Sequence, residues 1–247
     1  MSPPSLSVVI PAFNEALRLP ATLGRIRRQL EARGQPFEIV VVNDGSSDAT
    51  AEVARAAGAP VELLHHAQNR GKGHAVRAGM LAARGERRLM TDADLSTPIE
   101  ELARLESALA QGFDVAIGSR AVAGARIEVR QPAYREAMGR LFNRLVQTLL
   151  LPGLHDTQCG FKLFTAAAAT TAFSACRLDG FCFDVEALYV ARRRGLRIAE
   201  LPVVWRNDAA TRVGLGGGAF AFLDLLRIRL AAARGRYGPA AGASRPT

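Results

Sequence analysis

The first half of the chain alternates short runs of β-branched and aliphatic residues with longer stretches of helical character. We predict strands at LSVVI, FEIVVV, VELL, RLMT and DVAIGS, and helices over 15–33, 49–57, 74–84 and 98–111. Strands that alternate with helices in this way are typical of an α/β fold. The pattern therefore predicts a mainly parallel central sheet with helices on both faces.

The start of the helix predicted over 98–111 is marked in the sequence. Thr97 and Glu100 have the spacing of a capping box, and Pro98 occupies the first helical position. The preceding DADLS segment is therefore expected to form a loop at the carboxyl end of a strand. Ligands of open α/β sheets bind beyond these ends, so PAFNE, NDGSSD, DADLS and GSR should converge on one site.

The alternation stops between residue 121 and about residue 178. This part holds an arginine-rich segment, the apolar run RLFNRLVQTLLLPGL and then HDTQCGFKLF. A helix over 185–194, a strand-like LRIAELPVVW and the apolar tail GLGGGAFAFLDLLRIRL follow. The sequence shows no internal repeat and no interdomain linker, which favours a single domain.

The composition suits a globular protein that binds anions. The chain has 247 residues, is 49% hydrophobic and carries 32 basic against 23 acidic residues, a net charge of +9. A basic surface attracts nucleotides, nucleic acid or acidic lipid headgroups, and charge alone does not choose among them. Lysine occurs only at Lys72 and Lys162, both within motif-like segments.

Cysteine usage and hydropathy bear on the compartment. Cys159, Cys176 and Cys182 form no CxxC or zinc-like spacing, which argues against a disulfide scaffold or a structural metal and favours a reducing cytosol. The N-terminal MSPPSLSVVIPA does not have the pattern of a signal peptide. Each uncharged stretch is shorter than the roughly 20 apolar residues that span a bilayer. We therefore expect a chain that can touch a membrane without crossing it.

The strongest chemical signal is the DAD sequence that contains Asp92 and Asp94. Two carboxylates on a strand-end loop can coordinate a hard divalent cation, which would neutralise a leaving diphosphate. The alternative is that the two aspartates cap the following helix, a role that the sequence gives to Thr97. The three other polar strand-end loops favour the metal site.

Two further loops carry candidate binding groups. Asp44 follows the second predicted strand, where it can accept hydrogen bonds from a base or from ribose hydroxyls, although DGSS is also good turn chemistry. NRGKG at 69–73 is glycine-rich and can cradle a phosphate or form a plain surface turn. It is not a Walker loop, nor does it follow the first strand as a dinucleotide fingerprint does.

The order and spacing of PAFNE, VVNDGSSDAT, NRGKGHAVRAGM, TDADLSTP and AIGSR resemble family 2 glycosyltransferases of the GT-A fold. DTQCGFKLF, FCFDVEALYVARRRGLRIAELPVVW and a terminal TRV are similar to dolichyl-phosphate glucosyltransferases and the related mannosyltransferases. The likeness extends to about residue 213. DTQCGFKLF favours the glucosyl branch, which implies UDP-glucose as the donor and a polyprenyl phosphate as the acceptor.

The resemblance also implies roles for individual residues. Nucleotide-sugar binding is implied for Pro11, Ala12, Phe13, Glu15, Asp44, Gly71, Lys72, Asp92, Ala93, Asp94 and Arg212. Asp92 and Asp94 would hold the divalent cation, Mg²⁺ or Mn²⁺, while Arg120 and Arg135 would hold phosphate groups. Phe13 stands where the family usually has Tyr, and Arg212 where it often has Lys; the aromatic ring and the positive charge are retained.

The resemblance implies an inverting, metal-dependent reaction. A phosphate monoester acceptor is already anionic near neutral pH, so Asp94, Arg120 and Arg135 can act by positioning and by charge, without a strong base. A rival acceptor with a hydroxyl group would need a base, for which Asp156 is the candidate. The alternative, which the sequence favours, is that Asp156 hydrogen-bonds the backbone of the DTQCG turn.

Two other classes remain as alternatives. A nucleotidyltransferase shares the alternating sheet and an acidic metal site, but the chain has no glycine-rich basic signature after the first strand. A non-catalytic basic module at membrane or nucleic-acid surfaces would explain the charge but would leave the DAD loop without a purpose. We expect no nucleic-acid partner.

We divide the chain into a GT-A domain over 1–213, a C-terminal apolar and basic helix over 214–233 and a disordered tail over 234–247. The domain would have a nucleotide-sugar half, 1–120, and an acceptor half, 121–213. The protein is expected to be cytoplasmic and peripheral at the inner membrane face. Phe222, Leu226 and Leu230 recur at helical spacing, with Leu223, Arg227 and Arg229 nearby, and would dock there or pack into the core.

Overall fold

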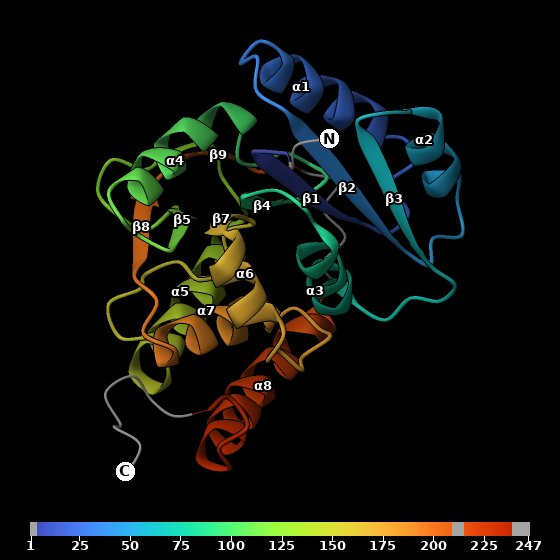
Figure 1. The fold of residues 1–247 in the computed structure, drawn as a ribbon. Coiled ribbons are helices and arrows are strands. Elements are labelled where there is room, and N and C mark those ends of the chain that lie inside the picture. The colour runs from blue at the N-terminus through green and yellow to red at the C-terminus, as the bar shows by residue number, and fades with distance from the viewer. Residues whose placement is uncertain (1–3, 209–214, 239–247) are drawn as a thin grey trace.

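The computed structural model describes residues 4–208 and 215–238, with no side-chain description for 215–220 (Figure 1). Its larger sheet has seven strands: β1 Leu6–Ala12, β2 Phe37–Asp44, β3 Val61–His66, β4 Arg87–Thr91, β5 Val115–Ser119, β7 Phe161–Thr165 and β8 Ile198–Pro202. Their spatial order is β3-β2-β1-β4-β7-β5-β8. A smaller sheet pairs β6 Arg126–Val129 with β9 Val204–Arg206.

Helices cover both faces of the larger sheet, as Figure 1 shows. The helices are α1 Leu19–Glu31, α2 Thr50–Ala56, α3 Lys72–Ala82, η1 Ile99–Glu101, α4 Leu102–Ala110, α5 Ala133–Leu149, α6 Ala166–Phe173, α7 Phe183–Arg193 and α8 Leu215–Ala233. Residues of α1 and α4 pack on one face, and residues of α3, α5, α6, α7 and α8 contribute to the core on the other.

Strand side chains alternate between the two cores, because successive residues of a strand point to opposite faces. Val8 and Ile10 of β1 belong to the core under α1 and α4, whereas Val9 belongs to the opposite core. All three are fully buried. A sheet buried on both faces explains the nearly continuous apolar runs from which the strands were predicted.

The predicted α/β fold with a mainly parallel sheet is confirmed. Strands β1, β2, β3 and β4 pair in parallel, and so do β5 and β8. β7 pairs antiparallel with both β4 and β5. Because β7 comes from the segment placed in the acceptor half, both predicted halves contribute strands to one sheet.

Two local predictions need correction. The 3-10 turn η1 precedes α4, and no side chain caps it; the Thr97 hydroxyl instead lies 3.6 Å from Cys159 Sγ. The capping box is therefore wrong. Order also continues past residue 234, because Tyr237 is buried and donates a hydrogen bond of 2.6 Å to Glu186 Oε1. Residues 239–247 of the predicted tail lie outside the described part.

Candidate active site

The carboxyl ends of β1 and β2 are adjacent because the two strands are parallel, and their loops are hydrogen-bonded to each other. The Asn14 amide donates to Ser46 Oγ at 2.9 Å, and the Ser47 amide donates to Asn14 Oδ1 at 2.9 Å. Asn14 has a φ of 56°, a left-handed conformation that Asn tolerates better than most residues. PAFNE and NDGSSD therefore meet as predicted.

The PAFNE residues differ in accessibility. Phe13 is 46% exposed and its ring is free to stack on a planar group, while Ala12 is buried. Glu15 forms an ion pair with Arg18 at 3.2 Å, and its backbone amide donates to Thr50 Oγ1 at 2.8 Å. Pro11 lies in β1 and pairs with Val42 of β2.

Asp44 anchors the NRGKG turn. Its buried carboxylate accepts hydrogen bonds from the amides of Arg70, at 3.1 Å, and Gly71, at 2.8 Å, and its Oδ1 lies 3.2 Å from His66 Nδ1. The carboxylate is therefore well satisfied within the protein, where it fixes the turn that ends at Lys72.

Asp44 also belongs to a group of possible metal ligands with His66 and His74. Their ligand atoms all lie within 4.8 Å of one another, a spacing that can hold a metal ion. Burial, followed by the positive charge of Arg70, lowers the pKa of His74, which keeps its ring neutral. The group is distinct from the predicted DAD ligands.

The DAD loop follows β4 and is tied to its surroundings at each residue. Asp92 Oδ1 lies 2.7 Å from Lys72 Nζ, the Ala93 carbonyl accepts from Thr22 Oγ1 at 2.5 Å, and Asp94 Oδ1 accepts from the Ser96 amide at 2.9 Å. The structure thus brings Asp92 and Lys72 together, two residues implied separately by the family motifs.

The electrostatics of the DAD loop suit a cation. Burial, and then the negative charge of Asp92, raises the pKa of Asp94. The Asp94 carboxylate therefore has too little positive charge near it to offset these two effects. A divalent ion would supply that charge, and carboxylate oxygens are the ligands that hard cations prefer. The residues therefore fit a divalent cation, whose remaining ligands would be supplied by a bound diphosphate or water.

Arg120, at the end of β5, is held by Asp156. Its Nε and Nη2 donate to the two carboxylate oxygens at 2.7 and 2.9 Å, and its backbone amide donates to Asp156 Oδ2 at 2.9 Å. The guanidinium carbon lies 5.2 Å from the centre of the Trp205 ring. Burial would raise the pKa of Asp156, but the charge and hydrogen bonds of Arg120 outweigh it and lower that pKa.

Of the two other arginines with predicted roles, the structure describes Arg135 but not Arg212. Arg135 lies in the first turn of α5; its Nε donates to Tyr134 Oη at 3.2 Å, and its guanidinium carbon lies 5.9 Å from that ring's centre. Arg212 lies outside the described residues.

A layer of buried polar residues beneath these loops was not predicted from the sequence. Lys162 Nζ lies 2.6 Å from Asp184 Oδ1, and Glu186 accepts from the amides of Arg177 and Leu178 at 2.9 and 2.8 Å. The presence of lysine at only two positions was the one signal that pointed toward this layer.

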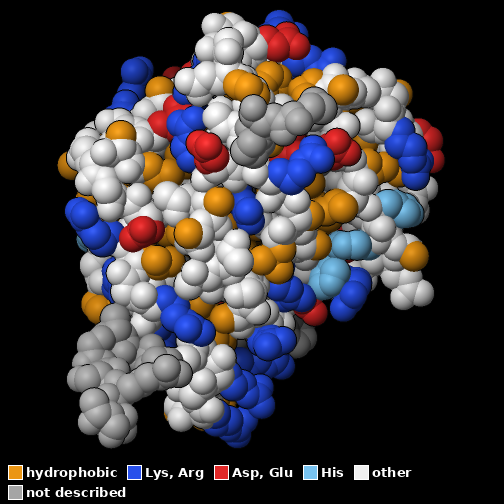
Figure 2. All heavy atoms as spheres, viewed as in Figure 1, with side chains coloured by type: hydrophobic (Ala, Val, Ile, Leu, Met, Phe, Trp, Pro, Cys, Tyr) orange, Lys and Arg blue, Asp and Glu red, His pale blue; other side chains and the backbone are white. Residues whose placement is uncertain are grey.

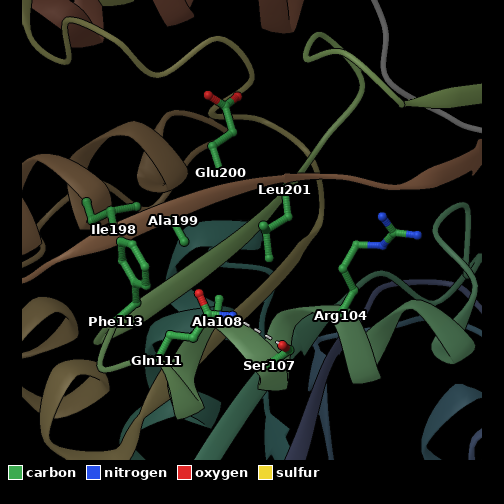
Figure 3. Close-up of a pocket in the computed structure, with 9 residues that line it drawn as sticks. All are labelled: Arg104, Ser107, Ala108, Gln111, Phe113, Ile198, Ala199, Glu200 and Leu201. Carbon is green, nitrogen blue, oxygen red and sulfur yellow. Dashed lines mark hydrogen bonds between the residues drawn. The ribbon is translucent and has the colours of Figure 1, made fainter.

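A hollow lies away from these loops, between α4 and β8 (Figure 3). It is lined by Arg104, Ser107, Ala108, Gln111, Phe113, Ile198, Ala199, Glu200 and Leu201. None of these residues carries a predicted role, so the strand-end loops remain the candidate active site.

Solved structures share this fold. Glucosyl-3-phosphoglycerate synthase from Mycobacterium tuberculosis, in complex with Mn²⁺, UDP and phosphoglyceric acid, is 18% identical with a TM-score of 0.69, over 97% of this chain and 80% of that one. Mannosyltransferase PcManGT from Pyrobaculum calidifontis, in complex with GDP-Man and Mn²⁺, is 22% identical with a TM-score of 0.64, over 97% and 66%. The fold is that of GT-A glycosyltransferases.

Sequence relatives narrow the assignment. Residues 7–171 match the model of Glycosyl transferase family 2. The dolichyl-phosphate beta-glucosyltransferase of Homo sapiens is 36% identical, over 91% of this chain and 75% of that protein. The enzyme of that name from Saccharomyces cerevisiae is 34% identical, over 94% and 76%. The chain is therefore a glycosyltransferase and belongs to glycosyl transferase family 2, among the relatives of the dolichyl-phosphate beta-glucosyltransferases.

Proposed function

We propose that the protein transfers glucose from UDP-glucose to a polyprenyl phosphate of the dolichyl class, with inversion at the anomeric carbon. The observation that carries the proposal is the DAD loop beside Lys72, in a chain whose relatives bear the name of that reaction. Two carboxylates and a cation at a strand end are suited to a diphosphate bound through a metal.

The donor is expected to lie across the ends of β1, β2 and β4. The exposed ring of Phe13 would stack on the base, and the Asp44 loop would border it. The Lys72 ammonium would meet the diphosphate. Arg212 is expected to add a second cation there, as the resemblance implies.

Asp92 and Asp94 would hold the divalent cation, Mg²⁺ or Mn²⁺. When bound, this ion would neutralise charge that develops on the departing diphosphate. The raised pKa of Asp94 supports the assignment, and the Mn²⁺ in the Mycobacterium tuberculosis and Pyrobaculum calidifontis structures is compatible with it.

The acceptor phosphate would be held by Arg120 and Arg135, in line behind the anomeric carbon. Asp156 is a poor general base, because its carboxylate bonds Arg120 and its pKa is lowered. An acceptor that is already anionic needs no such base. The ion pair between Asp156 and Arg120 therefore favours a phosphate over a hydroxyl acceptor.

The acceptor's apolar chain requires contact with a membrane, and we place that contact on α8. Leu223, Leu226 and Leu230 are each more than half exposed, while Phe222 contacts Phe142 of α5 and is partly buried. Basic side chains gather over α8 at the bottom of Figure 2. No helix in the described part of the chain is long and apolar enough to cross a bilayer. Docking at the cytoplasmic face would therefore be interfacial.

A donor screen tests the proposal. UDP-glucose, UDP-galactose and GDP-mannose are each offered with a short-chain polyprenyl phosphate, with Mn²⁺ and with a chelator. We expect the highest kcat/KM with UDP-glucose and loss of transfer with the chelator. A higher kcat/KM with GDP-mannose would refute UDP-glucose as the donor. Full activity with the chelator would refute the requirement for a divalent cation.

A further inference from the structure

The two lysines of the chain belong to one group of charged residues below the DAD loop. Lys72 pairs with Asp92 at 2.7 Å, and Lys162 pairs with Asp184 at 2.6 Å. Each of the two ammonium groups therefore has a carboxylate partner of its own.

Lys72 sits on a turn that is pressed against the segment before α7. The Gly73 amide donates to the Asp179 carbonyl at 2.8 Å. A Cβ at Gly71 would overlap that carbonyl oxygen, and a Cβ at Gly73 would lie 2.6 Å from the Leu178 oxygen. Both glycines allow a close approach that other residues would prevent. The segment that leads into Asp184 thus sets the position of Lys72.

Asp92 is pressed against the segment that leads into Lys162. A Cβ at Gly160 would overlap Asp92 Oδ2, so a glycine is needed there to accommodate the carboxylate. Lys162 Nζ also donates to the Cys159 carbonyl at 2.5 Å. One ammonium group therefore joins the backbone beside Asp92 to the carboxylate of α7.

We propose that Lys162 and Asp184 are positioning residues, which set the distance between Asp92 and Lys72 and so govern affinity for the nucleoside diphosphate. Both side chains are almost completely buried, at 2% and 6% exposure, and below the loops that would meet the substrate. A buried ion pair adds little stability over apolar residues of similar size. Its value here is geometric, and the inference rests on the proposed donor site.

The decisive variant replaces both partners, Lys162→Met with Asp184→Leu. It leaves no unpaired charge and removes only the hydrogen bond to the Cys159 carbonyl, so we expect it to fold with a Tm within about 10 °C of the wild type. Loss of residues that orient metal-binding groups typically weakens binding by roughly 10–100-fold, and we expect that loss in the Kd for UDP with Mn²⁺. The KM for UDP-glucose should rise similarly, while the acceptor KM stays within about twofold, because the acceptor groups are untouched.

A matched control is Glu38→Gln. Like Asp184, Glu38 is a buried carboxylate paired with a basic side chain, in this case Arg84. It lies at the amino end of β2, opposite the strand-end loops. This variant should lose stability and keep its Kd for UDP. Equal loss of UDP affinity in both variants would show that general destabilisation is responsible, and would overturn the inference.

The outcomes separate the two hypotheses. No UDP binding by the wild type would refute the proposed function, whereas a folded double variant with wild-type UDP affinity would refute only the positioning role. If the double variant does not fold, Asp184→Glu decides, because it keeps the charge and moves it by one methylene. A rise in the KM for UDP-glucose without a change in the acceptor KM supports the inference, and unchanged constants overturn it.

Discussion

Asp156→Asn gives a quantitative test of the Arg120–Asp156 pair. The substitution keeps the shape of a side chain that is 2% exposed but removes the charge that Arg120 faces. Removing one partner of a buried pair costs about 3–5 kcal/mol. Because the Arg120 side chain is 25% exposed, solvent recovers part of this cost, and we expect a loss of about 2–3 kcal/mol. In a chain of this size that lowers the Tm by about 4–12 °C.

The pH dependence of this loss has a definite sign. The pKa of Asp156 in the folded protein lies below its ordinary value of 3.8, so the carboxylate stabilises the fold above that value. The stabilisation is lost as the pH falls through the folded-state pKa. In urea unfolding, the gap between wild type and variant should be constant from about pH 7 to about pH 5 and should narrow below pH 3.8.

Glu100→Gln is the matched control. It breaks the Arg25–Glu100 pair, whose side chains are 37% and 47% exposed, and an exposed pair contributes at most about 1 kcal/mol. Equal losses of stability in the two variants would refute the reasoning. The ion-pair role of Asp156 would also be refuted if Asp156→Asn slowed turnover by roughly a hundredfold or more, altered the pH profile and caused little loss of stability. Removal of a general base has about that effect.

The site and the helices around it give three other predictions. Asp94→Asn should abolish transfer while circular dichroism shows a normal fold; near-normal turnover would refute the metal role. Leu226→Ser with Leu230→Ser should reduce binding to anionic liposomes but preserve transfer to a water-soluble acceptor. An equal loss of transfer to the lipid acceptor and to the water-soluble acceptor would show that α8 belongs to the core. Tyr237→Phe should destabilise the fold by about 1–3 kcal/mol in urea unfolding, because Glu186 loses a buried donor; no loss would mean that the bond is dispensable.

The sequence was sufficient for the elements whose signals are local. The β1, β2 and β4 runs are buried on both faces, and their polar ends fall where parallel strands place ligands. β7 was not predicted as a strand of this sheet, because its pairing with β4 and β5 depends on neighbours distant in the chain.

The same limit applies to the site. The loops that carry Asp44 and Asp92 could be predicted, because each follows a recognisable strand. The ion pairs around these loops could not, since the Arg120–Asp156 bond spans 36 residues and the Lys162–Asp184 bond spans 22. Such contacts are set by packing and have no periodicity along the sequence.

The hydrogen bond from Tyr237 to Glu186 links the last described residues to the interior. Glu186 also accepts hydrogen bonds from the backbone amides of Arg177 and Leu178. These two residues directly precede Asp179, whose carbonyl accepts from the Gly73 amide of the turn that carries Lys72. A chain shortened before residue 237 would leave one Glu186 oxygen without its donor and would loosen that support. A functional truncated chain must therefore keep Tyr237. An affinity tag is better added after residue 238 than put in place of the segment that contains Tyr237.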